Sequence, residues 1–159
     1  MKLTILCVGK CREKYFTDAA AEYLKRLSRY AKTEVIEVKD EKTPDEASQH
    51  EEELIRGTEG KRLLERLPEN AYVICTAIDG KSYDSVGLSE RLSGLMLKGE
   101  SHICFVIGGS IGLSESVIAK ADEKWSFSKL TFPHQLMRVI LTEQLYRAFR
   151  IMNHEPYHK

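Results

Sequence analysis

The sequence predicts an α/β fold in which a parallel sheet is sandwiched between helices. Short apolar runs alternate along the chain with stretches of helical periodicity, and several of these runs are apolar at almost every position. Strands covered by helices on both faces lose the polar–apolar alternation of half-exposed strands, and regular strand–helix alternation favours parallel pairing. We expect a single domain over residues 1–159, without internal repeats.

The first half of the chain predicts two strands, each followed by a helix. Leu3–Val8 and Glu34–Lys39 are the strands, and Arg12–Tyr30 has apolar residues at the spacing of one helical face. Thr43-Pro44-Asp45-Glu46 combines capping-box spacing with a proline at the first helical position, so the next helix is expected to begin there. We expect that helix to weaken or break around Gly57 and Gly60.

The second half continues the alternation. Ala71–Ala77 predicts a third strand that ends in a turn at Asp79-Gly80-Lys81. The remaining elements are expected at Leu88–Leu97 (helix), Ile103–Ile107 (strand), Ser114–Ala121 (helix), Trp125–Ser128 (strand) and His134–Met152 (helix).

The last helix carries more apolar surface than one stripe. Its apolar residues are Leu136, Met137, Val139, Ile140, Leu141, Leu145, Tyr146, Ala148, Phe149, Ile151 and Met152. A helix that is apolar on most sides is buried on most sides. The second side either packs on another copy of the chain, which would give a homodimer, or is covered within one subunit.

Composition limits the partners and the compartment. The chain has 24 basic and 24 acidic residues, so it carries no overall bias toward a polyanion. Residues 1–39 are nonetheless basic, nine to five, and either form an RNA-binding face or are ordinary solvated surface. No apolar run is long enough to span a membrane, and we expect a cytoplasmic protein. Three of the four cysteines fall in strand-like runs, as small hydrophobic residues do, and no metal-binding spacing is found.

Two strand ends suggest a small-molecule pocket. The run Phe105-Val106-Ile107 stops at Gly108-Gly109-Ser110-Ile111-Gly112, and the Trp125–Phe132 run stops at Pro133. The glycines either permit positive φ in a tight turn or allow a ligand close to the backbone. Phe127–Pro133 either lines an apolar slot or is a strand with a proline-terminated turn. Ligands of open α/β sheets bind beyond the carboxyl ends of the strands. The C-terminal tail, with His154 and His158, either frays or docks over this edge.

Several segments together resemble the RlmH family, a group of SPOUT-type methyltransferases that modify a pseudouridine of large-subunit ribosomal RNA at N3. The resemblance spans essentially the whole chain. It rests on Met1–Lys10, Phe105–Gly109, Leu130–His134, Arg138-Val139, Glu143–Ala148 and Tyr157-His158.

This resemblance implies a C-terminal trefoil knot and S-adenosylmethionine as the cofactor, bound in the knot. Thr76 stands where some relatives carry leucine, so a backbone contact is expected there. By matching position, the cofactor-binding residues would be Thr76, Gly108, Phe127, Ser128, Lys129, Leu130, Thr131 and Phe132.

The implied reaction needs a group that accepts the N3 proton or stabilises the resulting anion. We expect His158 to act as the general base that accepts the proton. Tyr157 would orient His158 or stack on the target nucleobase, and Arg147 would stabilise the negative charge. The implied partners are a second copy of the chain and the ribosome, with neither DNA nor membrane. Candidate phosphate contacts are Lys10, Arg12, Arg138, Arg147 and Arg150.

Two rival functions fit the pattern of elements. A flavodoxin-like protein would bind a phosphate-bearing cofactor at Gly109–Gly112. A ribosome-associated factor would bind its partner without catalysis.

Overall fold

The computed structural model describes all 159 residues and contains one five-stranded, fully parallel sheet. Strands and helices alternate, so the predicted α/β fold class is confirmed. The strand order is β2-β1-β4-β3-β5. The strands are β1 (Lys2–Val8), β2 (Lys32–Val38), β3 (Tyr72–Ser82), β4 (His102–Ile107) and β5 (Glu123–Ser126).

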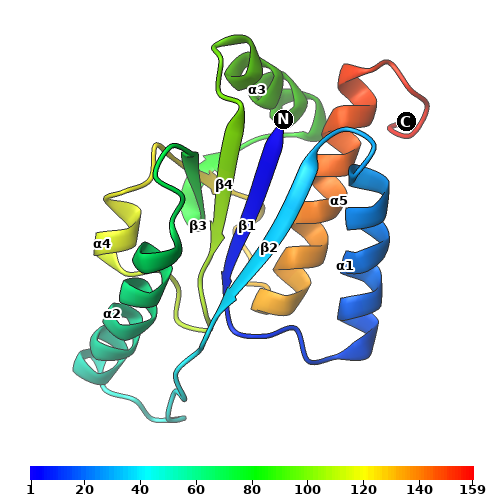
Figure 1. The fold of residues 1–159 in the computed structure, drawn as a ribbon. Coiled ribbons are helices and arrows are strands. Elements are labelled where there is room, and N and C mark those ends of the chain that lie inside the picture. The colour runs from blue at the N-terminus through cyan, green and yellow to red at the C-terminus, as the bar shows by residue number, and fades with distance from the viewer.

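Helices cover both faces of the sheet (Figure 1). On one face lie α1 (Lys14–Leu27), α3 (Ser85–Leu97) and α5 (His134–Met152), and on the other lie α2 (Gln49–Arg66) and the short α4 (Glu115–Ile118). Side chains of β1 alternate between the two cores: Leu3, Ile5 and Cys7 pack toward α1, α3 and α5, whereas Leu6 and Val8 pack toward α2 and α4. This double coverage explains the continuous apolar runs.

The strand order excludes the flavodoxin-like rival. That fold has the order 2-1-3-4-5. Here β4 pairs with β1, and β3 lies between β4 and β5. The chain therefore has a different topology, and the carboxyl ends of β3, β4 and β5 are neighbours.

The predicted start of the second helix was wrong. Helix α2 begins at Gln49, and its capping box is formed by Ser48 and Glu51. The Oγ atom of Ser48 accepts from the Glu51 N–H at 3.2 Å, and the Glu51 carboxylate accepts from the Ser48 N–H at 2.7 Å. The expected break near residues 57–60 was also wrong, because α2 is continuous. A Cβ atom at Gly60 would overlap Ser114, so this glycine allows α2 and the start of α4 to pack closely.

The predicted turn at Asp79-Gly80-Lys81 is instead an irregular continuation of β3. Both Thr76 and Lys81 pair with Trp125 of β5, so the residues between them form a bulge. A Cβ atom at Gly80 would lie 2.7 Å from backbone carbons of Lys124 and Trp125. The glycine marks a close approach of two strands, not a reversal of the chain.

Helix α5 begins and ends at the predicted residues. The sheet, α1 and α3 bury one broad side of it, including Leu141, Leu145 and Phe149. Part of its apolar breadth is therefore explained within one chain. Ile140 and Met152 are half-buried and pack against the same core. The half-buried apolar residues that remain are Leu136, Val139 and Ile151, which we name the outer stripe of α5.

Three cysteines lie in the sheet as predicted. Cys7, Cys75 and Cys104 are fully buried free thiols, and Cys11 is half-buried. Burial raises the pKa of the Cys75 thiol to about 12, so the group stays protonated. None of the helices has the length and apolar character of a membrane span.

Candidate functional site

A cleft of about 1070 Å³ opens beyond the carboxyl ends of β3, β4 and β5. Three segments form most of its wall: residues 76–79, residues 107–113 and residues 125–134. Met137 of α5 and Ile118 of α4 add apolar surface, and α2 contributes Glu52 and Arg56. The predicted pocket at these strand ends is therefore present, and it has the size and apolar lining typical of a small-molecule site.

Most of the residues expected to contact the cofactor surround this one cleft. Lys129 does not line it, although it belongs to the same loop. The residues that do line it are Thr76, Gly108, Phe127, Ser128, Leu130, Thr131 and Phe132.

In the glycine turn after β4, residues of the same turn pack closely against one another. A Cβ atom at Gly108 would lie 2.8 Å from the carbonyl carbon of Gly112 and 3.1 Å from Cγ of Leu113. Gly112 has φ +85°, a conformation that L side chains rarely adopt. Of the two explanations for the glycines, a tight turn with positive φ therefore holds at Gly112, and the bare backbone of this turn borders the cleft.

Side chains of the loop after β5 are used to hold its backbone. Ser126 Oγ donates to the Ser128 carbonyl at 3.1 Å, and Ser128 Oγ accepts from the Leu130 N–H at 2.9 Å. Thr76 behaves similarly, because its hydroxyl donates to the Val106 carbonyl at 3.1 Å. Polar contacts from these positions to a ligand would thus come from peptide groups, while Phe127 and Phe132 supply flat apolar surface.

His134, the first residue of α5, also lines the cleft and was not among the predicted site residues. Its Nδ1 atom is buried and has no hydrogen-bond partner. Burial, and then the positive charge of Arg138, lower the pKa of this imidazole, so it is neutral at pH 7. Two sequence signals were available for it: its place after a proline at the end of a loop, and the segment Leu130–His134 in the family resemblance.

The three predicted catalytic residues lie together around the carboxylate of Glu143. Glu143 Oε1 accepts from Arg147 Nε at 3.0 Å and from the Tyr157 hydroxyl at 3.0 Å. The Arg147 guanidinium lies 4.6 Å from the centroid of the Tyr157 ring, and one of its nitrogens lies 3.4 Å from His158 Nδ1. We call Glu143, Arg147, Tyr157 and His158 the tail cluster. The C-terminal tail is thus docked on its own helix.

The environment of Tyr157 makes its phenol a poor proton acceptor or donor near neutral pH. Burial, and then the hydrogen bond to Glu143, raise the pKa of Tyr157 well above its ordinary value. The ring also packs edge-on against Tyr146, with centroids 4.9 Å apart. These contacts suit an orienting or stacking group.

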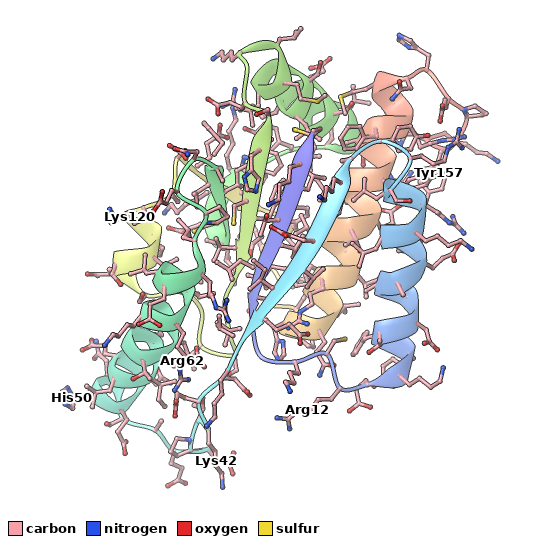
Figure 2. The ribbon with its side chains drawn as sticks, viewed as in Figure 1. Arg12, Lys42, His50, Arg62, Lys120 and Tyr157 are labelled. Carbon is pink, nitrogen blue, oxygen red and sulfur yellow. The ribbon has the colours of Figure 1, made fainter.

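Within one chain the tail cluster and the cleft are far apart. None of its four residues lines the cleft. Arg147 lies thirteen positions after His134 in α5, which corresponds to about 20 Å along the helix axis. Figure 2 shows Tyr157 at the opposite end of the molecule from Arg12, whose N–H donates to Gln135 in the first turn of α5.

Three of the five candidate phosphate contacts are engaged inside the protein, and one of them is Arg147, which the tail cluster holds. Arg138 is 4% exposed, pairs with Glu37 and donates to the Gly9 carbonyl, so its proposed role in binding RNA was wrong. Arg150 pairs with Glu155 at 2.6 Å and stabilises the tail. Lys10 and Arg12 are exposed at the carboxyl edge of the sheet.

Comparison with known proteins assigns the class. The family model described as "Predicted SPOUT methyltransferase" matches residues 1–158, so the chain belongs to the SPOUT methyltransferase family. The resemblance noted in the sequence is thereby confirmed. Because this family consists of methyltransferases, the match favours an enzyme over the rival function, a ribosome-associated factor without catalysis.

The names of similar curated proteins specify the type of methyltransferase. Each of the following is named "Ribosomal RNA large subunit methyltransferase H" and aligns over 159 residues, the full length of both chains. They come from Clostridium novyi (strain NT), at 55% identity, Clostridioides difficile (strain 630), at 52%, and Bacillus pumilus (strain SAFR-032), at 50%.

A solved structure supports the fold alone. It is titled "The structure of a probable methylase family protein from Haemophilus influenzae Rd KW20". It matches with a TM-score of 0.57 and 13% identity, over 99% of this chain and 70% of that one.

Proposed function

We propose that this chain methylates N3 of a pseudouridine in 23S ribosomal RNA of the large subunit, on assembled ribosomes, with S-adenosylmethionine as methyl donor. The carrying observation is full-length identity of 50–55% to proteins named as large-subunit methyltransferases. The cleft at the carboxyl ends of three strands supports the proposal, because it joins apolar slots to exposed peptide groups. Residues 1–159 would form one catalytic domain, and its knotted C-terminal segment stays a prediction from the family.

The cleft fits an adenosine-containing donor. Phe127 and Phe132 offer surfaces for a flat heterocycle, and the peptide groups of Thr76, Gly108 and residues 128–131 offer donors and acceptors for its polar edges. A bound sulfonium donor supplies an electrophilic methyl group, so the protein has to align the nucleophile and handle one proton.

The tail cluster provides the groups for that proton. In our proposal His158 accepts the N3 proton, and Arg147, which lies beside it, stabilises the negative charge that develops on the base. Tyr157 keeps its own proton and positions Arg147 through Glu143 and its ring.

A homodimer would bring the tail cluster to a cleft. Proton transfer needs contact, and none of the cluster residues lines the cleft of its own chain, where Arg147 lies about 20 Å along α5 from His134. Two-fold packing of two α5 helices side by side and antiparallel would set the C-terminal end of one against the N-terminal end of the other. The outer stripe of α5 supplies apolar surface for this contact, and it lies between the two ends.

Recognition of the RNA would depend on a local surface and on the shape of the particle. The formal net charge is zero, so the chain as a whole does not attract a polyanion. Lys10 and Arg12 lie exposed near the cleft end of α5, where phosphates of a ribosomal groove would approach. We expect the reaction in the cytoplasm, with neither DNA nor membrane as a partner.

Methyl transfer to ribosomes tests the proposed function directly. Ribosomes from a strain that lacks the gene are incubated with the protein and donor labelled in the methyl group, and the modified nucleotide is identified by mass spectrometry. We expect label in 3-methylpseudouridine of the large subunit. Absence of transfer, or label in another base, would contradict the proposal. Sedimentation at micromolar concentration tests the dimer, which a purely monomeric boundary would exclude.

A further inference from the structure

We propose that Arg56 and Glu52 of α2 bind the amino-acid end of the methyl donor, Arg56 through its carboxylate and Glu52 through its ammonium group. This inference rests on the proposed function, since it assumes that the cleft holds an S-adenosyl compound. The residues expected from the family lie on the strand ends and the loop after β5. Glu52 and Arg56 lie instead on α2, which covers the sheet face opposite to α5, so the donor would also contact a helix.

The charges of the cleft point to Arg56. Four ionisable side chains line the cleft: Glu52, Arg56, Asp79 and His134. Asp79 is largely exposed and pairs with Lys124 at 2.6 Å. His134 is neutral at pH 7, because burial lowers its pKa. Arg56 is therefore the one cation in the lining, and a ligand carboxylate in this cleft has no other positive partner.

Arg56 is fixed in place but keeps free donors. One of its terminal nitrogens donates to the Ile111 carbonyl of the glycine turn at 3.3 Å. Its distance to Glu52 Oε2 is 3.8 Å, which exceeds a hydrogen bond. A guanidinium has five N–H donors, and this geometry leaves most of them for a bidentate contact with a carboxylate. Its side chain is 25% exposed, so water competes only in part.

Glu52 completes a match to a zwitterion. It lies one helical turn before Arg56, and both side chains line the cleft. The amino-acid end of an S-adenosyl compound carries a carboxylate and an ammonium group on one carbon, so a cation and an anion on one helix face complement both. In the sequence this pair has the i, i+4 spacing of an ordinary surface ion pair, so its place in the cleft could not be predicted.

Binding calorimetry with two ligands tests the inference without any turnover. S-Adenosylhomocysteine carries the amino-acid end, and 5′-methylthioadenosine lacks it but retains the adenosine and the sulfur. In the Arg56→Gln variant, which removes the charge but retains a side-chain N–H donor, we expect affinity for S-adenosylhomocysteine to fall by about 10- to 100-fold. Affinity for 5′-methylthioadenosine should change by less than about twofold, since it makes none of these contacts. Glu52→Gln should weaken S-adenosylhomocysteine in the same selective way, by a smaller factor.

Arg66→Gln is the matched control. It makes the same substitution in the last turn of α2, at an exposed position outside the cleft, and both affinities should remain those of the wild type.

Equal weakening of both ligands by Arg56→Gln would assign Arg56 to holding the glycine turn and overturn the inference. Unchanged binding of both ligands would overturn it as well, and if ribosome affinity alone fell, Arg56 would be an RNA contact. In each of these cases the proposed function would stand. A wild-type protein that binds neither ligand would instead remove the proposed function, and this inference with it.

Discussion

The two ends of α5 contrast sharply. At its N-terminal end the helix meets a large cleft with a mostly apolar surface, which Glu52 and Arg56 also line, and the neighbouring His134 is neutral. At its C-terminal end the Arg147 guanidinium contacts a carboxylate, a phenol ring and an imidazole, and none of these groups lines the cleft. One end is built to bind and the other to handle charge. This difference supports our proposal that the two ends are half-sites, which a second copy of the chain would join.

The largest expected effect is at the glycine turn. In Gly108→Val the added side chain would collide with the backbone of Gly112, so the turn has to open and the cleft loses its wall. We expect affinity for S-adenosylhomocysteine, measured by calorimetry, to fall by about 1000-fold or more, a loss of over about 4 kcal/mol.

Gly57→Val is the control for this prediction. Gly57 lies in α2 with no atom within 4 Å of an added Cβ, so ligand binding should be unchanged. Normal binding by Gly108→Val would mean that the turn does not border the ligand, and the cleft end would lose its assigned role.

The next effect is on stability and concerns Arg138, one turn into α5 from the cleft. Arg138→Met removes the partner of Glu37 and leaves the Gly9 carbonyl without its donor. Because Glu37 is exposed, the main cost comes from the buried Gly9 carbonyl, and we expect a loss of about 2 to 3 kcal/mol in the free energy of unfolding, measured with urea. A loss below about 1 kcal/mol would indicate that Arg138 is free to serve another partner, such as RNA.

A pH-dependent effect is expected at β5, away from both ends of α5. Burial alone would raise the pKa of Glu123, but hydrogen bonds from Arg91, Trp125 and Tyr72 outweigh it and lower the pKa to about 2. A depressed pKa stabilises the fold above the ordinary glutamate pKa of about 4.5, and this contribution is lost as pH falls toward 2.

The Glu123→Gln variant should therefore be less stable than the wild type at pH 7, by about 2 kcal/mol, with the difference shrinking below pH 4.5. Urea titrations at pH 7, 4 and 3 measure it. A difference that is constant across these pH values would show that the carboxylate charge contributes nothing.

The smallest effect is expected where the tail leaves α5. His154 has φ 54°, in the left-handed region, directly after the helix cap at Asn153. His154→Gly should raise the free energy of unfolding, measured with urea, by up to about 1 kcal/mol, because glycine adopts this conformation without strain. Its activity should stay at the wild-type level, since the tail cluster is not altered. Destabilisation would mean that the imidazole itself anchors the tail.

Local patterns predicted the elements better than their long-range contacts. The bounds of α5 followed from apolar periodicity and from Pro133 before it. The start of α2 did not, because Thr43-x-x-Glu46 and Ser48-x-x-Glu51 have the same capping pattern, and local sequence does not choose between them. Likewise Gly80 has the local signature of a turn, and only its packing against β5 reveals a bulge.

The candidate site was predicted to a similar degree. The strand-end glycines and the loop 127–132 were found from the sequence and from a family resemblance, and the structure brings most of them to one cleft. Glu52, Arg56 and His134 were missed, because a charged pair on a helix and a histidine after a proline have no distinctive pattern. These residues are far apart in the sequence, and only the tertiary fold brings them to the same cleft.

Mixing two inactive variants tests the central claim most directly. Gly108→Val spoils the cleft and keeps the tail cluster, whereas His158→Ala spoils the cluster and keeps the cleft. If the tail of one chain serves the cleft of its partner, every mixed dimer contains one intact site. Subunits that exchange at random would then restore about one quarter of wild-type methyl transfer to ribosomes, because half of the dimers are mixed and each has one working site of two. A mixture as inactive as its two components would contradict the account.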